Sequence, residues 1–272
     1  METHEQTEEF LKIDVFRSSE GEKEPSYSQY KIPRMKQLTV LAALQYAREH
    51  FDSSLVFNYS CEKQRCGSCA MKIDGKISLA CFTPARDGQK ISPLPGFKIL
   101  RDLVVDWTPY ELRMLGSLPV LSSVTIQSER NEYSEGSEPR IQPISGQVPP
   151  LAHNLETSNE NQREISESAS TCIRCFSCVG ACPTVDVTFP HGFAGPALSV
   201  MLAAHIDQEG TSKDYVSSIM KSNLEYCTRC YACNAVCPAS INIVGCIQEL
   251  QKIASSSDPN AKRLNQMVNG YF

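Results

Sequence analysis

Eight cysteines in the C-terminal half of the chain repeat one spacing twice. Each run reads C-x2-C-x2-C-x3-C and is followed directly by proline. The first run is Cys172, Cys175, Cys178 and Cys182, and the second run is Cys227, Cys230, Cys233 and Cys237. This spacing is typical of ligand runs that hold two iron–sulfur clusters, in which the fourth cysteine of each run binds the other cluster.

The repeated spacing also predicts which cysteines share a cluster. Three thiolates at every third residue can each bind one corner of a cubane, while the fourth lies one helical turn further on and points toward a neighbouring cluster. We therefore predict two [4Fe–4S] clusters that exchange their last ligand. Set 1 is Cys172, Cys175, Cys178 and Cys237, and set 2 is Cys182, Cys227, Cys230 and Cys233.

Two other uses of cysteine fit this pattern poorly. A structural zinc site takes four Cys or His ligands, usually as two CxxC pairs, and needs no such repeated run. Disulfide frameworks are typical of small secreted domains, whereas this chain has 272 residues. The spacing favours iron–sulfur clusters over both.

Four cysteines in the N-terminal half have a different spacing, C-x4-C-x2-C and then a fourth cysteine further on. This N-terminal set is Cys61, Cys66, Cys69 and Cys81. The spacing predicts a plant-type [2Fe–2S] cluster. Asp74-Gly75 is a favoured type I′ hairpin turn. Pairing of Ile73 with Lys76 across that turn would place Cys81 beside the loop that carries the other three thiols.

Residues near these cysteines allow two interpretations each. Gly67 and Ser68 fit a loop whose amides approach cluster sulfurs and tune the potential, but they also fit an ordinary turn. Arg65 is either a solvated surface charge or a tuning charge. We expect Trp107 to serve packing, and Cys246 to be a buried free thiol.

The elements that must position the N-terminal set follow from periodicity. Residues 10–17 alternate apolar and polar side chains, which predicts a half-buried strand, and residues 30–35 are expected to return beside it. An apolar stripe then predicts a helix that begins after Thr39, a plausible N-cap. The stripe consists of Val40, Leu44, Ala47 and Phe51. A hairpin, a helix and then a cysteine loop indicate a β-grasp domain.

Helical periodicity dominates the C-terminal half. Residues 196–206 and 213–226 are expected to form helices between the two runs, with a third helix after the second run. The predicted fold class is α+β, with an N-terminal β-grasp plant-type ferredoxin domain and a C-terminal all-α bacterial-type two-cluster ferredoxin domain. We place these at residues 9–107 and 172–255, with a linker at 108–171 and a tail at 256–272.

Composition excludes some functions and constrains location. The linker is polar with short helices expected at 108–116 and 155–170, so we expect it to lie on a partner or on the first domain. The net charge of −5 provides no basic footprint for nucleic acid. The N-terminus lacks the apolar core of a signal peptide, and no stretch approaches the ~18 apolar residues of a membrane span. We expect a cytoplasmic chain that can reach the membrane only through partners.

The order of the motifs resembles one protein family. Together with CGSCAMKIDGK, KILRDLVVDW, CIRCFSCVGACP and GPA, the cysteine runs are similar to the iron–sulfur subunit of succinate dehydrogenases and fumarate reductases. The resemblance covers about residues 9–255. In that family a FAD-containing flavoprotein subunit interconverts succinate and fumarate, and the iron–sulfur subunit carries electrons to or from quinone in a membrane anchor.

The resemblance implies a place for each cluster. The N-terminal set would face the flavin, set 1 would hold the middle cluster, and set 2 would hold the distal cluster. The chain would lie at the cytoplasmic face of the membrane, bound to its partner subunits. It would carry electrons and contain no residues that convert substrate.

Two departures from the family pattern concern the distal end. Most members have a [3Fe–4S] distal cluster with three cysteines, whereas Cys230 supplies a fourth thiolate here, so we expect [4Fe–4S]. Archaeal-type succinate dehydrogenases, methylmenaquinol:fumarate reductases and thiol:fumarate reductases share this feature, and many use a CCG-motif subunit in place of the usual membrane anchor. The family's aromatic pair at the quinone site is absent, and Thr228 stands where a His is common. Phe189 and His191 are the possible quinone-proximal substitutes.

Three functions are therefore weighed. The first is the electron-transfer subunit of a succinate dehydrogenase or fumarate reductase that is linked to quinone. The second keeps this architecture in a thiol-dependent fumarate reductase or a related flavoprotein complex. The third is a free-standing ferredoxin-like carrier, which the long linker and the additional family motifs disfavour.

Overall fold

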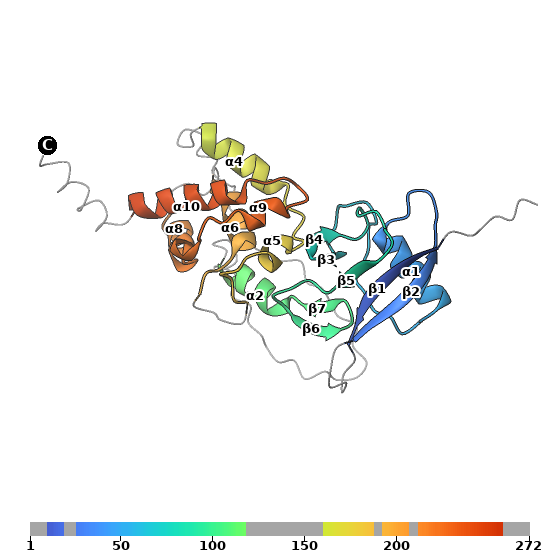
Figure 1. Ribbon diagram of the computed structural model, residues 1–272. Coiled ribbons are helices and arrows are strands. Elements are labelled where there is room, and N and C mark those ends of the chain that lie inside the picture. The colour runs from blue at the N-terminus through green and yellow to red at the C-terminus, as the bar shows by residue number, and fades with distance from the viewer. Residues whose placement is uncertain (1–9, 19–25, 118–159, 188–191, 207–211, 258–272) are drawn as a thin grey trace, which may run out of the picture.

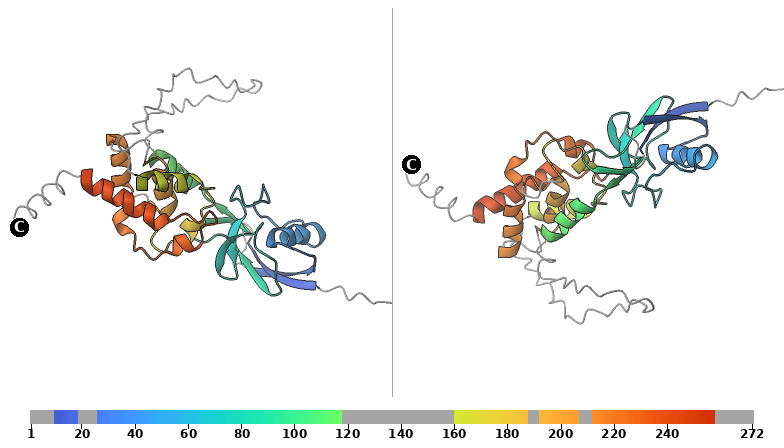
Figure 2. Two further views of the ribbon diagram at one scale, coloured as in Figure 1. Left: turned by 90° about the horizontal axis from the view of Figure 1, so that it is seen from above. Right: turned by 90° about the horizontal axis from the view of Figure 1, so that it is seen from below.

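The computed structural model describes residues 10–18, 26–117, 160–187, 192–206 and 212–257, and these residues form two lobes. A mixed sheet with one helix builds the first lobe, and short helices build the second. The two lobes lie side by side in all three views (Figures 1 and 2).

The sheet lobe contains five strands in the order β2-β1-β5-β3-β4. Strand β1 (Phe10–Arg17) lies antiparallel to β2 (Ser26–Pro33) and parallel to β5 (Gln89–Ser92). Strand β3 (Ala70–Ile73) lies antiparallel to β5 and to β4 (Lys76–Leu79). This is the β-grasp arrangement that the element order predicted.

The returning strand of the first hairpin begins earlier than predicted. The alternation in β1 is confirmed, because Leu11, Ile13 and Val15 are all buried. Strand β2 starts at Ser26 rather than at residue 30, since it pairs along the whole of β1, as far as Arg17. Register across the hairpin, and not local composition, sets this boundary.

Helix α1 (Val40–His50) packs on the sheet and begins as predicted. The Thr39 hydroxyl accepts a hydrogen bond from the Ala42 amide at 3.2 Å, which caps the helix. The first three residues of the predicted stripe are buried. Phe51 is 55% exposed, so its assignment to that stripe was wrong. The helix ends at His50, and the residue after it no longer follows the helical period.

The β3–β4 hairpin has the predicted turn. Asp74 and Gly75 have φ values of 49° and 79°, as a type I′ turn requires, and Ile73 pairs with Lys76. The register continues beyond the strands, where the Ala80 amide donates to the carbonyl of Cys69 at 3.0 Å. The hairpin therefore brings its two ends, and the cysteines there, together.

The second lobe is helical, as predicted. Its elements are α4 (Glu160–Ser170), α5 (Ser177–Gly180), α6 (Pro196–Ala203), α8 (Lys213–Lys221), η1 (Leu224–Tyr226), α9 (Ala232–Ala235) and α10 (Ile243–Ser257). Helix α10 packs against α4, α6 and α8. The helix predicted over 213–226 stops at Lys221, because Asn223 adopts a left-handed conformation.

A segment between the lobes belongs to the helical core. It comprises β6 (Lys98–Arg101), β7 (Val104–Asp106) and α2 (Thr108–Ser117). The buried Tyr110 hydroxyl of α2 donates to the Ala194 carbonyl at 2.8 Å. Apolar side chains of this segment and of the residues just before it share one core with the second lobe; they are Leu94, Phe97, Val105, Tyr110 and Met114.

Helix α4 corrects an expectation about the linker. It packs on α6 and α10 of its own lobe, and the Ser166 hydroxyl donates to the Ala204 carbonyl at 2.8 Å. This part of the linker therefore packs on the second lobe and not on the first. The rest of the linker, residues 118–159, falls outside the described residues.

Asp102, in the turn between β6 and β7, carries a buried carboxylate that connects segments of the sheet lobe. Asp102, whose side chain is 2% exposed, accepts hydrogen bonds from Arg17 Nε at 2.9 Å, the Val56 amide at 2.9 Å and the Ser18 amide at 3.1 Å. One side chain thus holds two separate segments, the end of β1 at residues 17–18 and the loop at Val56. Removing it would leave two backbone amides and a guanidinium without this acceptor.

We expect Asp102→Ala to lower the free energy of unfolding by about 3–5 kcal/mol, the usual effect of removing one partner from a buried ion pair. Denaturant unfolding of the full chain, followed by circular dichroism, measures this loss. Asp14→Ala is the control, because Asp14 accepts a bond from Gln29 at the surface of the same lobe. Equal losses for the two variants would contradict the role given to Asp102.

Candidate iron–sulfur cluster sites

The N-terminal set lies at one end of the sheet. Cys61 and Cys66 are half-buried on the loop that follows α1, while Cys69 precedes β3 and Cys81 follows β4. The hairpin register puts the last two thiols close to each other. All four predicted [2Fe–2S] ligands are therefore gathered at this end of the lobe.

The loop turns its backbone amides toward sulfur. Cys61 Sγ accepts from the amides of Lys63 at 3.4 Å, Arg65 at 3.2 Å and Cys66 at 3.3 Å. Glu62 and Gln64 make this possible, because both adopt left-handed φ values, 55° and 56°. Alternating conformations of this kind form a concave nest of amides that favours negative charge.

The interpretation of this loop as an amide donor to sulfur fits Ser68, whose backbone amide and hydroxyl both hydrogen-bond to Cys66, with the hydroxyl 2.8 Å from Cys66 Sγ. Sequence reasoning did not find the three amides at positions 63, 65 and 66 that donate to Cys61 Sγ. Arg65 has an exposed side chain and contributes through its backbone.

Two thiols of the N-terminal set, Cys66 and Cys69, differ in acidity. Burial alone would raise the pKa of Cys66, but hydrogen bonds from Ser68 and from backbone amides lower it to about 6. Burial raises the pKa of Cys69 to about 12, and the adjacent Cys81 thiol adds to the rise. Cys66 is therefore prepared as a thiolate, whereas Cys69 needs a bound cation to lose its proton.

The two runs have the same backbone conformation. Arg174 and Phe176, on either side of Cys175, have φ values of 52° and 56°. Arg229 and Tyr231, on either side of Cys230, have φ values of 54° and 60°. Each run then continues into a four-residue helix, α5 or α9, and these helices pack together. Left-handed residues other than glycine cost about 1–3 kcal/mol each and cluster at functional sites.

Set 1 surrounds one apolar cavity. All four of its cysteines line it, together with apolar side chains from both runs and from α6, among them Phe176, Ala197 and Ile241. Cys237 reaches this cavity from the second run, which is where the predicted exchange of ligands requires it to lie. Burial raises the pKa of Cys178 well above that of a free thiol, and the nearby charges of Cys175 and Cys172 raise it further.

Set 2 lies beside set 1 and nearer the surface. Burial raises the pKa of Cys233 to about 11, and the charges of Cys182 and Cys227 contribute, so these three thiols lie close together. Cys230 is exposed, and Tyr226 and Tyr231 next to it are exposed as well. Cys233 also contributes to the raised pKa of Cys178, which shows that the two sets are neighbours.

The residues present fit iron–sulfur clusters. All thirteen cysteines are described, and none forms a disulfide. Within the described ranges, no three Cys, His, Asp or Glu side chains converge on a point as ligands of a single metal ion do. Buried thiols that raise one another's pKa ionise only around a cationic centre, and a coordinating metal removes their protons outright. A multinuclear cluster fits this arrangement better than a single zinc ion.

Hydroxyl groups beside sulfur recur in a way that the sequence analysis missed. The Ser177 hydroxyl lies 3.3 Å from Cys175 Sγ, and the Thr184 hydroxyl lies 3.3 Å from Cys182 Sγ. Ser68 holds the same position relative to Cys66. A Ser or Thr two residues after a ligand cysteine is the sequence signal that would have found all three.

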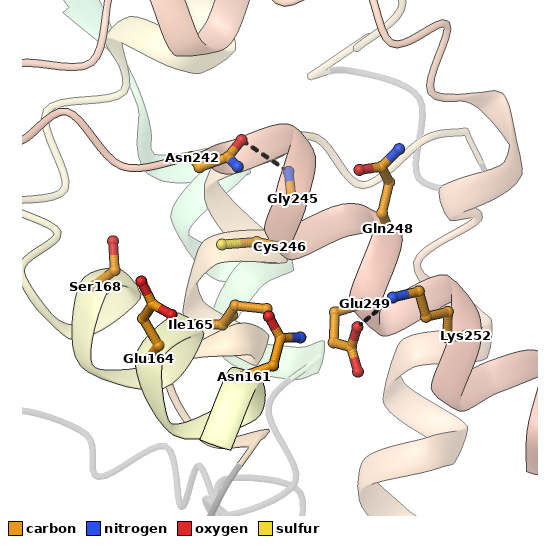
Figure 3. A pocket seen from close by; sticks show the side chains of 10 residues that line it. All are labelled: Asn161, Glu164, Ile165, Ser168, Asn242, Gly245, Cys246, Gln248, Glu249 and Lys252. Atoms are coloured by element: carbon orange, nitrogen blue, oxygen red, sulfur yellow. Dashed lines mark hydrogen bonds and ion pairs between the residues drawn. The ribbon is translucent and has the colours of Figure 1, made fainter. Parts of the chain in front are cut away.

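A polar pocket between α4 and α10 lies outside the cysteine sets (Figure 3). Cys246 lines it from α10 and is buried, as predicted, and burial raises the pKa of its thiol to about 12. The Glu249–Lys252 ion pair, at 2.9 Å, lies on the same helix. The candidate quinone-proximal residues Phe189 and His191 fall outside the described residues.

Comparison with known proteins agrees with this division. Residues 11–111 match the 2Fe-2S iron-sulfur cluster binding domain family, and residues 168–241 match the 4Fe-4S dicluster domain family. The fumarate reductase iron-sulfur subunit of Haemophilus influenzae is 30% identical over 91% of this chain and 94% of its own. The chain belongs to the fumarate reductase and succinate dehydrogenase iron–sulfur subunit family.

Other members of the family differ in length. One subunit of the fumarate reductase (CoM/CoB) from Methanothermobacter marburgensis is 26% identical over 90% of this chain. The chain spans 44% of that relative, so it covers less than half of the length of the archaeal family members that it matches.

A solved structure supports the family fold. A chain of the Mycobacterium smegmatis Sdh1 complex in the apo form superposes with a TM-score of 0.67 at 21% identity. The alignment covers 92% of this chain and 98% of the other. No helix in the described ranges is long and apolar enough to cross a bilayer.

We expect Ser68→Ala to lower the reduction potential of the [2Fe–2S] cluster, because a hydrogen bond to sulfur stabilises the more negative reduced state. A bond worth about 1 kcal/mol more to the reduced cluster corresponds to about 40 mV for a one-electron couple. A redox titration followed by electron paramagnetic resonance measures the shift. Ser60→Ala, an exposed neighbour of Cys61, is the control, and an unchanged potential in Ser68→Ala would contradict the prediction.

Proposed function

We propose that the chain is the electron-transfer subunit of a succinate dehydrogenase or fumarate reductase complex. The observation that carries this proposal is the serial arrangement of three cysteine sets. Cys175 of set 1 packs into the core of the sheet lobe that carries the N-terminal set, and set 1 neighbours set 2. Electrons can thus pass from one end of the molecule to the other while the chain itself converts no substrate.

The proposed cofactors are one [2Fe–2S] and two [4Fe–4S] clusters. The N-terminal set would bind the first, set 1 the middle cluster and set 2 the distal cluster. The cavity lined by set 1 and the equal backbone conformations around Cys175 and Cys230 support this assignment. The clusters would supply one-electron chemistry, while the chain positions them and tunes them by burial and hydrogen bonds to sulfur. We likewise keep 9–107, 108–171, 172–255 and 256–272 as the proposed divisions of the chain.

The two ends of the molecule would meet different partners. Beside the N-terminal set, Phe82 follows Cys81 and is 68% exposed at the edge of the cleft between the lobes, which suits docking of a FAD-containing flavoprotein. At the other end, exposed Tyr226, Cys230 and Tyr231 would face a membrane anchor or a CCG-motif subunit. Quinone would be reached through that partner, with Phe189 and His191 as candidate contacts, at the cytoplasmic face of the membrane.

A second candidate is a thiol-dependent fumarate reductase. The similarity to the Methanothermobacter fumarate reductase (CoM/CoB) favours it. The missing aromatic pair after Pro183 also favours it, because this chain then lacks the aromatic residues that contact quinone in the family pattern. Rapid reduction of the clusters by a dithiol and not by a quinol, in the purified complex, would select this candidate.

We expect the chain to purify with a flavoprotein of the succinate or fumarate type. Purification from its own cells without oxygen, followed by mass spectrometry and flavin absorbance, should give about one FAD per chain. Recovery of a stable and fully loaded monomer with no flavin would contradict the proposal and favour a free-standing carrier.

We expect the complex to contain about ten irons per chain, as two [4Fe–4S] clusters and one [2Fe–2S] cluster require. Four thiolates leave no iron of the distal cluster without a protein ligand. Cys230→Ser should therefore convert that cluster toward [3Fe–4S] and raise its potential. Electron paramagnetic resonance of the oxidised complex measures the conversion.

Cys246→Ser is the matched control for this variant, because Cys246 belongs to no cysteine set and should leave all three clusters unchanged. A stoichiometric [3Fe–4S] signal in the unmutated protein would show that Cys230 is not a ligand.

A further inference from the structure

Gly67 of the sheet lobe lies directly against Cys175 of the helical lobe. It stands between Cys66 and Cys69 of the N-terminal set, is buried, and has a φ of +73°. A Cβ atom at this position would lie 2.6 Å from Cys175 Cβ and 2.7 Å from Cys175 Cα. Distances below 3.0 Å are not found for real Cβ atoms, so any side chain here would displace something.

The opposing atoms cannot turn aside. They are the backbone and the Cβ atom of Cys175, a residue that is 7% exposed and lies between the two left-handed residues of the first run. Its thiol is a proposed ligand of the middle cluster. A side chain at Gly67 would therefore have to move one of the two loops away from the other.

Other contacts around this point show that it is part of a continuous interface. Strand β4 packs against α5, and a cleft beside the contact is lined by residues of both lobes, including Gln64, Phe82, Ser177 and Cys237. Cys175 itself belongs to the apolar core of the sheet lobe. The N-terminal cluster loop thus rests directly on the backbone of a residue in set 1.

We infer that Gly67 is a positioning residue that sets the gap between the [2Fe–2S] cluster and the middle cluster. This inference rests on the proposed ligand assignment. Electron tunnelling falls exponentially with the distance between redox centres, so close approach of the two ligand loops speeds transfer. The missing side chain allows Cys66 and Cys69 on one loop, and Cys175 on the other, to bring their clusters together.

Glycine could also be needed at position 67 only because the backbone there has a positive φ. The chain contains a control that separates this backbone requirement from the need for close contact with Cys175. Gly88 has a φ of +72°, and a Cβ there would meet nothing within 4 Å. Gly88→Ala therefore introduces the same backbone strain in the same lobe without a clash. Any effect of Gly67→Ala beyond that of Gly88→Ala comes from the contact with Cys175.

The test compares the wild-type complex with Gly67→Ala and Gly88→Ala. The first measurement is the spin relaxation of the reduced [2Fe–2S] cluster, which a nearby reduced cluster accelerates through a magnetic interaction that decreases steeply with distance. The second is the rate at which the middle cluster is reduced after the [2Fe–2S] cluster has been reduced by a light pulse. Iron content shows that each variant is fully loaded.

We expect Gly67→Ala to weaken the magnetic interaction and to slow the transfer several-fold, while Gly88→Ala matches the wild type in both. Equal behaviour of the two variants would overturn the inference. The wild-type protein also decides the question without any variant. If reduction of the middle cluster left the relaxation of the [2Fe–2S] cluster unchanged, the two clusters would not be neighbours, and the inference would be wrong.

These outcomes differ from failure of the proposed function. Absence of a [2Fe–2S] signal from the fully assembled wild-type complex would overturn the ligand assignment itself. If all three clusters are present at full iron content, the comparison of the variants tests only whether the missing side chain at Gly67 sets the gap between the two clusters.

Discussion

Crowding of thiols in a protein interior is the constraint on which the rest of the structure depends. Burial raises the pKa of Cys69, Cys178 and Cys233, and neighbouring thiols raise these pKa values further. Such groups can lose their protons together only when a cationic centre lies among them. The fold therefore places these thiols where they can surround a metal centre, and protein stability and metal binding are coupled.

The backbone around the cysteines meets the same constraint locally. Left-handed residues flank Cys175 and Cys230 in the same pattern, and Glu62 and Gln64 have similar conformations in the first lobe. Each such residue is unfavourable in isolation. The conformation turns amides inward, and three of them reach Cys61 Sγ. Backbone strain, amide dipoles and nearby hydroxyls thus act together on sulfur.

The lobes must also be held in a fixed relation, because distance controls electron transfer. Aromatic side chains accomplish this: Phe176 of the first run packs against Phe97, Trp107 and Tyr110, with ring centroids 5.6–6.1 Å apart. These partners belong to the segment that follows the sheet, so the connection between the lobes is part of the helical core. Set 1 consequently packs against both lobes, with Cys175 in the core of the sheet lobe and Phe176 in the core of the helical lobe.

The sequence by itself determined the spacing of the cysteine sets, the fold class and the β3–β4 turn. All three depend on local spacing or on short-range periodicity, which a chain carries wherever it folds. Register and packing were decided only in the tertiary structure: β2 starts at Ser26, Phe51 is exposed and α4 rests on α6 and α10. The donors to Cys61 and the contact of Gly67 with Cys175 could not be predicted either. They arise from backbone conformation and from segments far apart in the chain, and no local pattern of residue types records them.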